Sequence, residues 1–162
     1  MCDRCGEPGL AAHGVSISER PAQRLVGVMW EGSFAEAADG ALKQVMARAK
    51  ALSDAQAGLW KSPLVTLSWS ADGQRLRHFA GIDMDGDMPE GFDAVDLPPM
   101  RFATSWHGAD DGEVIDHYAG MIGWLRENAL RHDRAVLDQR EEYPPDADLA
   151  GPPALRLMLP IA

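Results

Sequence analysis

A glutamate and a tyrosine near the C-terminal end carry the clearest chemical signal in the sequence. The segment AVLDQREEY at 135–143 is typical of a β-strand, in which alternate residues point to opposite faces. One face would carry Leu137, Gln139, Glu141 and Tyr143, and the other Val136, Asp138, Arg140 and Glu142. A carboxylate among apolar neighbours is costly unless it is paired, so Glu141 would have a raised pKa or bind a cation. The alternative is a solvated glutamate at a strand end.

Aromatic residues are the second candidate feature. The chain has 5 Trp, and three of them lie at or near the ends of predicted strands, where a groove would open: Trp30, Trp69 and Trp106. Aromatic walls around one anion suit flat or cationic ligands, although tryptophan also packs ordinary cores. We add Phe79 and His107 to the candidate ligand-binding residues. His107 follows Trp106 and is expected at a groove rim, with a role as catalytic base less favoured.

Charge and motifs argue against several other functions. The chain has 25 Asp and Glu against 15 Lys and Arg, a formal net charge of −10, which disfavours non-specific binding to nucleic acid or anionic membranes. No apolar stretch approaches the roughly 18 residues of a membrane span, and no signal peptide is evident. We therefore expect a cytoplasmic protein without direct DNA or membrane contact. The sequence lacks phosphate-binding loops, nucleophile elbows, dinucleotide fingerprints and metal triads, so no cofactor is expected.

Two cysteines lie near the start of the chain. Cys2 and Cys5 form one CxxC pair, which is half of a zinc site, and there is no second pair. We interpret residues 1–13 as a flexible tail, with metal and redox roles as the alternatives.

The first half of the chain predicts a β-α-β-β unit. A strand spans about 15–30, and a capping box formed by Ser33 and Glu36 then begins a helix with one apolar face. Strands at 62–70 and 76–84 follow as a hairpin.

The second half predicts the same unit. The strand MRFATSW opens it at residue 100, and Asp110 and Asp111 are placed to cap the following helix. The last two strands are expected at 135–143 and 154–161.

A short motif marks the same joint in both halves. WEG at 30–32 and WHG at 106–108 each end a strand before a helix, and they are 76 residues apart. We therefore predict that Trp30 superposes on Trp106 and Gly32 on Gly108, because an internal repeat is a strong indicator of fold.

Two such units predict an α+β fold with pseudo-two-fold symmetry. The strands would form a curved antiparallel sheet with both helices on one face and a ligand groove between the repeats. We expect a single domain at 14–162, with repeat one at about 14–84 and repeat two at about 100–162. The Asp-, Gly- and Pro-rich residues 85–99 would link them.

Together these features resemble the GyrI-like small-molecule-binding family, whose module also serves as the effector-binding domain of AraC- and MerR-type bacterial regulators. The resemblance covers about 15–161 and rests on the order of RLVGV, WHG, GWL, EEY and LMLPI. The chain departs from the family pattern at two places. It has GADDG where the family often has Gly-Pro-Tyr, and it has YPPDAD, without a proline after Asp146, where the family has Tyr-x-x-Asp-Pro. The resemblance implies a groove for apolar, often aromatic or cationic compounds. It places the central glutamate at Glu141, with Tyr143 beside it.

Three functions remain open from the sequence. The first is a stand-alone binding domain that binds or sequesters an apolar, cationic aromatic molecule. The second is a hydrolase for an electrophilic compound, with Glu141 and Tyr143 as the acid/base pair. The third is a protein inhibitor of a nucleic-acid enzyme such as gyrase, which would have a protein partner. The lack of a second clear polar catalytic group favours binding.

Overall fold

The predicted strands and helices form in the predicted order, with two further strands. The computed structural model describes residues 14–56, 61–72, 74–84 and 86–162, so Cys2 and Cys5 lie outside the described residues. The strands are β1 (Ser16–Arg20), β2 (Gln23–Ser33), β3 (Leu64–Asp72), β4 (Arg75–Asp83), β5 (Asp93–Leu97), β6 (Met100–His107), β7 (Gln139–Tyr143) and β8 (Leu155–Ile161). The helices are α1 (Phe34–Glu36), a π-helical turn (Ala37–Ala41), α2 (Leu42–Asp54) and α3 (Val114–Glu127).

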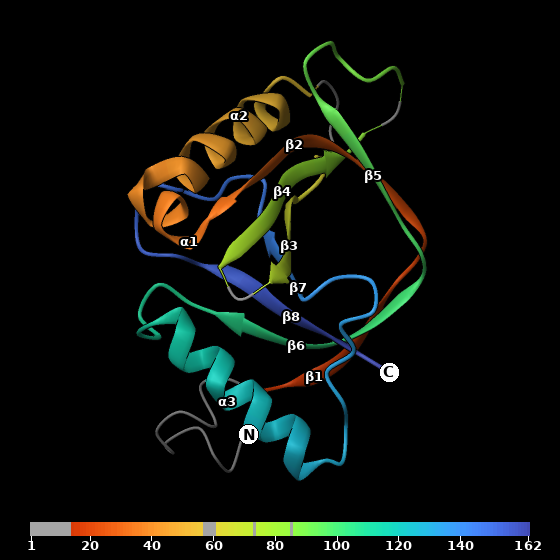
Figure 1. The fold of residues 1–162 in the computed structure, drawn as a ribbon, viewed down its shortest axis with the longest axis vertical. Coiled ribbons are helices and arrows are strands. Elements are labelled where there is room, and N and C mark those ends of the chain that lie inside the picture. The colour runs from red at the N-terminus through yellow and green to blue at the C-terminus, as the bar shows by residue number, and fades with distance from the viewer. Residues whose placement is uncertain (1–13, 57–60, 73, 85) are drawn as a thin grey trace.

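The strands form one curved antiparallel sheet with pseudo-two-fold symmetry (Figure 1). Its order is β1-β6-β8-β7-β3-β4-β2-β5, so β7 and β3 meet at the centre and each repeat extends outward from them. Helix α2 packs on the first repeat and α3 on the second, both on the same face. The predicted fold class is confirmed.

The outermost strands are exchanged between the repeats. β1 lies at the start of the first repeat but pairs with β6 of the second, whereas β5 lies in the predicted linker and pairs with β2 of the first. The residues predicted as a linker, 85–99, therefore contain β5. Their Asp, Gly and Pro content concealed the apolar alternation of Val95 and Leu97, which pack into the core.

Each helix begins differently from the other. The predicted capping box is present, because Ser33 Oγ accepts a hydrogen bond from Glu36 N (3.1 Å) and Ser33 N donates to Glu36 Oε1 (3.0 Å). Gly40 has φ of 108° and interrupts the helix between α1 and α2. The predicted Asp caps of α3 are wrong: its N-cap is Glu113, and Asp111 instead accepts from Gly108 N (2.7 Å) in the preceding turn.

The tryptophans of the two Trp-x-Gly motifs lie on opposite faces of the sheet. Trp30 packs against the apolar cluster beneath α2. Trp106 borders a hollow on the other face, together with Arg140 and Glu142. The motifs mark the same joint, but their tryptophans are not equivalent.

The strand register explains this difference. One row of paired residues crosses the sheet through Val28, Ala80, Thr66, Glu141, Leu157 and Ser105. Thr66 and Glu141 are the middle pair between the central strands, so Val28 corresponds to Ser105. Two residues further along, Trp30 corresponds to His107. The predicted superposition of Trp30 on Trp106 and of Gly32 on Gly108 is therefore wrong by one residue.

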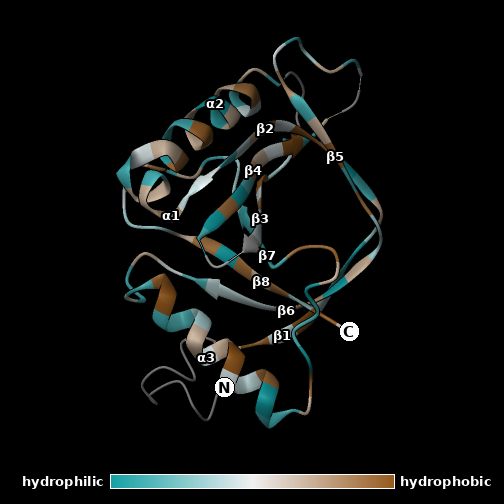
Figure 2. Ribbon diagram, viewed as in Figure 1, coloured by the Kyte–Doolittle hydropathy of each residue, from teal (hydrophilic) through white to brown (hydrophobic). Residues whose placement is uncertain are grey.

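The core has a layer on each side of the sheet. One cluster lies under α2 and another under α3, and a third on the opposite face includes Leu67, Phe79 and Leu137. Figure 2 shows apolar and polar residues alternating along both helices, as expected for helices with one packed face. None of the helices in the described residues is both long and apolar enough to cross a membrane.

Candidate functional site

A hollow of about 360 Å³ lies between the two repeats on the helix-bearing face. Its floor comes from the central strands β3, β4 and β7, and its walls from α1, α2 and the segment before β7. The lining residues are Phe34, Leu42, Ser68, Ser70, Leu76, His78, His132, Arg134, Asp138, Gln139 and Glu141. We call this hollow the central groove.

Glu141 is the acidic group at the floor of the central groove. Its Oε1 accepts a hydrogen bond from Thr66 Oγ1 on the paired strand (3.1 Å), and its Oε2 accepts from Tyr118 OH on α3 (2.7 Å). Burial raises the pKa of this carboxyl, although both hydroxyl donors and the nearby His107 oppose the rise. The described residues form no ion pair with Glu141: its two hydrogen bonds come from neutral hydroxyls, and the nearby His107 makes no hydrogen bond to it.

Strand alternation orients Glu141 as predicted, but over a shorter segment. Glu141 and Tyr143 face the helices, whereas Glu142 faces the other side. The prediction that Leu137 shares a face with Glu141 is wrong. Leu137 precedes β7, where the chain no longer alternates as a strand, and it packs into the core on the opposite face.

His78 is a buried imidazole that lines the central groove together with Glu141. Its Nδ1 lies 3.1 Å from Ser68 Oγ, and its Nε2 has no hydrogen-bond partner among the described residues. Burial lowers the pKa of His78 to about 4, so this imidazole is neutral at physiological pH.

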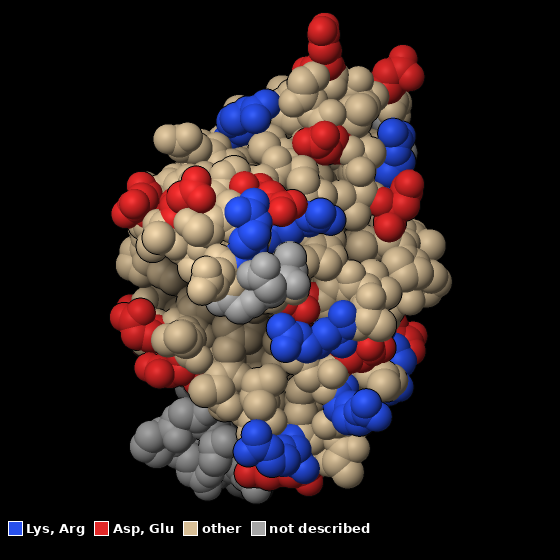
Figure 3. All heavy atoms as spheres, viewed as in Figure 1, with Lys and Arg blue, Asp and Glu red and all other residues tan. Residues whose placement is uncertain are grey.

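The rim of the groove contains a paired arginine. Arg134 donates to both carboxylate oxygens of Asp138, each at 3.0 Å, and Asp138 also accepts from Ser70 N (2.6 Å). Figure 3 shows acidic and basic groups interspersed on the face seen there, despite the net charge of −10. Arg134 and Asp138 balance each other's charge at the rim, whereas Glu141 has no ion-pair partner among the described residues.

A second hollow adjoins the central groove. It measures about 760 Å³, lies between α2 and residues 144–154, and shares Leu42 with the central groove. Tyr143 and Trp106 also line it. Burial raises the pKa of the Tyr143 hydroxyl, which stays protonated.

The structure separates the other predicted site residues. Trp30 shares the helix-bearing face with Glu141 but packs beneath α2. Phe79 is fully buried in the core of the opposite face, and Trp69 packs against the same cluster. Trp69 Nε1 donates to Val136 O (2.7 Å). None of these three residues lines the central groove.

His107 lies in the interior rather than at a rim. Its Nδ1 is 2.8 Å from Nδ1 of His117, its Nε2 is 3.1 Å from Gly112 O, and His117 Nε2 is 2.7 Å from Ser105 Oγ. Because a carbonyl only accepts, His107 Nε2 carries a proton, and with a neutral His107 the proton of the Nδ1–Nδ1 contact belongs to His117. This chain of hydrogen bonds ties the turn before α3 to the sheet and leaves His107 inaccessible to a ligand.

Comparison with known families identifies this arrangement. The model of the GyrI-like small molecule binding domain matches residues 13–162. The chain belongs to this family. A search of curated proteins gave no match.

Solved structures share the GyrI-like fold at low sequence identity. The EcmrR C-terminal domain matches with a TM-score of 0.64 and 13% identity, covering 93% of this chain and 98% of that one. SAV2435 bound to tetraphenylphosphonium matches with a TM-score of 0.67 and 13% identity, covering 92% and 94%. A hydrolase from Listeria innocua matches with a TM-score of 0.58 and 16% identity, covering 91% of each chain.

Sequence reasoning missed several residues of this GyrI-like groove. Thr66 and Tyr118 donate hydrogen bonds to Glu141. Ser68 and His78 were not singled out. Alternation along SPLVTLSWS and RLRHFAG could have placed Thr66, Ser68 and His78 on one face. No sequence pattern links Tyr118 to Glu141, because their contact depends on how α3 packs.

Proposed function

We propose that the chain binds an apolar, cationic aromatic small molecule in the central groove, with the Glu141 carboxylate as the charged contact. The supporting observation is that Glu141 is held by two hydroxyl groups and forms no ion pair with the described residues. A desolvated carboxylate is costly, and a cation placed beside it would recover that free energy.

The apolar walls suit the ring system of such a ligand. Phe34 is 46% exposed, an unusual exposure for a phenylalanine, and it lines the groove with Leu42 and Leu76. Tyr143 and Trp106 extend the aromatic surface into the adjoining hollow. The likeness in fold to SAV2435 bound to tetraphenylphosphonium adds support.

The proposal is tested by changing only the charge of Glu141. Tetraphenylphosphonium is expected to bind the wild type with micromolar affinity, about −8 kcal/mol, measured by calorimetry and by tryptophan fluorescence. Glu141→Gln should weaken this binding about 10- to 100-fold, because a charge-assisted contact in a partly dry site is lost. Neutral triphenylphosphine oxide should bind the variant as well as, or better than, the wild type.

The matched control is Glu127→Gln, which removes the same charge from an exposed position at the end of α3. Glu142 is unsuitable as a control, because it is buried and paired with Arg20 and Arg140. Equal affinities of wild type and Glu141→Gln for the cation would refute a charged contact at Glu141.

Hydrolysis is the second candidate function, favoured by the 2.7 Å contact between Tyr118 OH and Glu141. This pair replaces the predicted pair of Glu141 and Tyr143, because no hydrogen bond joins those two side chains. If Glu141 activates water, Glu141→Gln should still bind a strained electrophile such as an aryl epoxide but convert it at least about 10²-fold more slowly. Unchanged turnover of a converted epoxide would exclude this role.

A further inference from the structure

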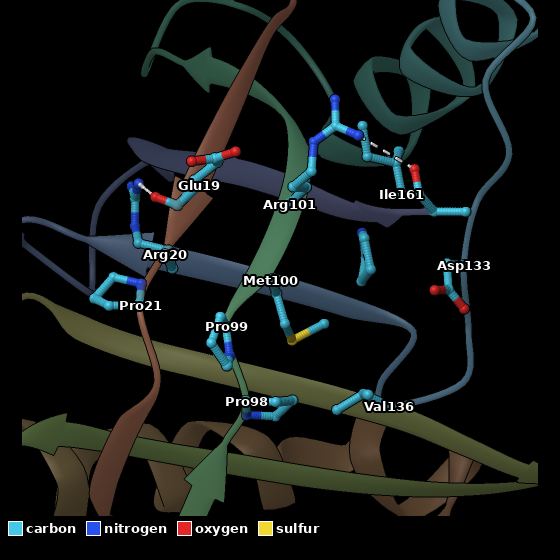
Figure 4. A pocket seen from close by; sticks show the side chains of 12 residues that line it. Glu19, Arg20, Pro21, Pro98, Pro99, Met100, Arg101, Asp133, Val136 and Ile161 are labelled. Atoms are coloured by element: carbon cyan, nitrogen blue, oxygen red, sulfur yellow. Dashed lines mark hydrogen bonds between the residues drawn. The ribbon is translucent and has the colours of Figure 1, made fainter.

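The face of the sheet opposite the central groove has a hollow of its own, in which three arginines surround one glutamate. This hollow measures about 470 Å³, and we call it the arginine hollow. Its lining residues are Arg20, Gln23, Pro63, Val65, Trp106, Arg140, Glu142, Tyr143, Pro144 and Arg156. A neighbouring, proline-rich hollow where the exchanged strands turn shares Arg20 with it (Figure 4).

Both carboxylate oxygens of Glu142, the single glutamate of the arginine hollow, already accept hydrogen bonds from arginines. Arg20 donates to both oxygens of Glu142, from Nε (2.9 Å) and Nη2 (2.8 Å). Arg140 approaches the same carboxylate through Nε (2.9 Å) and also donates to Gln23 Oε1 (3.0 Å). Only 3% of the Arg140 side chain is exposed. One carboxylate therefore serves two guanidinium groups, one of them almost fully desolvated.

Arg156, the third arginine, adds a positive charge that no described residue pairs with. Arg156 lies on β8 directly between Trp106 on β6 and Glu142 on β7. It is exposed, and it forms no hydrogen bond or ion pair with the described residues. Asp83 is linked to Gln23 (3.0 Å) and offsets part of this charge from outside the hollow. The lining remains cationic in a chain whose net charge is −10.

An aromatic wall adjoins the cationic groups. Trp106 is 45% exposed, so its indole is available for stacking beside the Arg156 guanidinium. Guanidinium groups bind carboxylates and phosphates through paired N–H donors, and a hollow of this size accommodates a small organic ligand. From this geometry we infer that the arginine hollow binds a small aromatic anion, with its acidic group on Arg156 and Arg20 and its ring against Trp106.

The arginine hollow shares Trp106, Tyr143 and Pro144 with the hollow that adjoins the central groove, but it shares no lining residue with the central groove itself. Its charge preference is opposite to that of the proposed cation site. The probe is 1-naphthoate, titrated calorimetrically and followed by the ¹H–¹⁵N cross-peak of the Trp106 indole, assigned with Trp106→Phe. We expect saturable binding that weakens as salt is added and a shift of that cross-peak. Neutral 1-naphthylmethanol should bind at least about tenfold more weakly, because it lacks the charge-assisted contact.

Arg156→Gln is the decisive variant, because an exposed residue without partners can be changed with little effect on folding. It should weaken 1-naphthoate binding at least about tenfold. Arg24→Gln on β2 is the matched control, since it removes one exposed positive charge outside the hollow and should change the affinity less than twofold. Glu141→Gln should also leave 1-naphthoate binding unchanged, and Arg156→Gln should leave tetraphenylphosphonium binding unchanged.

Three outcomes would overturn the inference. One is the absence of 1-naphthoate binding up to millimolar concentration. Another is equal weakening by Arg156→Gln and Arg24→Gln, which would indicate a general charge effect. The third is loss of 1-naphthoate binding in Glu141→Gln, which would place the anion in the central groove. Failure of tetraphenylphosphonium to bind would refute only the proposed function.

Discussion

Half-buried Glu141 and buried His78 are ionisable groups that lie on the same face of the central sheet and affect stability in opposite directions. Burial raises the pKa of Glu141 and lowers that of His78, so the folded protein favours the neutral form of both. The Glu141 contribution to the free energy of unfolding therefore decreases as the pH rises above the ordinary glutamate pKa, because the unfolded chain loses this proton more readily than the folded protein. The His78 contribution decreases as the pH falls below the ordinary histidine pKa, because the unfolded chain takes up this proton more readily than the folded protein.

The pKa of His78 predicts a specific acid sensitivity. The unfolded chain protonates this histidine near pH 6.5, whereas the folded protein does so only near pH 4. The free energy of unfolding should therefore fall by about 3 kcal/mol between pH 6.5 and 4 through this group alone. His78→Asn, which can retain a hydrogen bond to Ser68, should lose that component in urea unfolding measured across the same pH range. Parallel pH profiles of the two proteins would contradict the prediction.

At the scale of the elements, β2 and β4 approach each other unusually closely at a glycine pair. Gly27 and Gly81 are directly opposite, and a Cβ on Gly27 would lie 2.0 Å from the carbonyl oxygen of Ala80. A glycine inside a β-rich segment often marks a bend or bulge. The structure shows regular pairing there, so the glycine is needed for close backbone approach.

Substituting this glycine should therefore separate the two strands. Gly27→Ala is expected to lower the free energy of unfolding by at least about 2 kcal/mol, measured by urea denaturation, because the contact is with backbone that cannot move aside. Gly123→Ala on α3 is the matched control. Its Cβ would meet nothing within 4 Å, so it should stabilise the protein by about 0.5–1 kcal/mol. A Gly27→Ala variant as stable as the wild type would disprove the close approach.

At the scale of the whole molecule, exchanged strands and a shared central pair join the two repeats. β1 and β5 each complete the other repeat's edge, and β3 pairs with β7 across the middle of the sheet. Neither repeat retains its full sheet without the other, although their helices pack over separate clusters.

This connectivity predicts a single cooperative unfolding transition. Tryptophan fluorescence and far-ultraviolet circular dichroism should give the same urea midpoint, because separating the repeats breaks strand pairs in both. Shortening the chain to begin at Gln23, which removes β1, should destabilise the second repeat as well as the first. Two resolved transitions in the intact protein would show that the repeats fold independently.

The sequence by itself determined the repeat, the capping box and the side of β7 on which Glu141 lies. Each depends on local rules: hydrophobic period, cap chemistry and strand alternation. Alternation also correctly separated Glu141 from Glu142. It failed at Leu137, because the strand begins later than its β-rich composition indicated.

Tertiary structure alone decided which side chains meet. Strand register, which the 76-residue spacing of the motifs missed by one residue, set Trp30 and Trp106 on opposite faces. No local sequence pattern predicts that β1 pairs with β6 and β5 with β2. The packing of α3 brought Tyr118 to Glu141, and the sheet gathered Arg20, Arg140 and Arg156 from three strands around Glu142. These contacts join residues far apart in the chain, so they form only when all the strands have paired in the complete sheet.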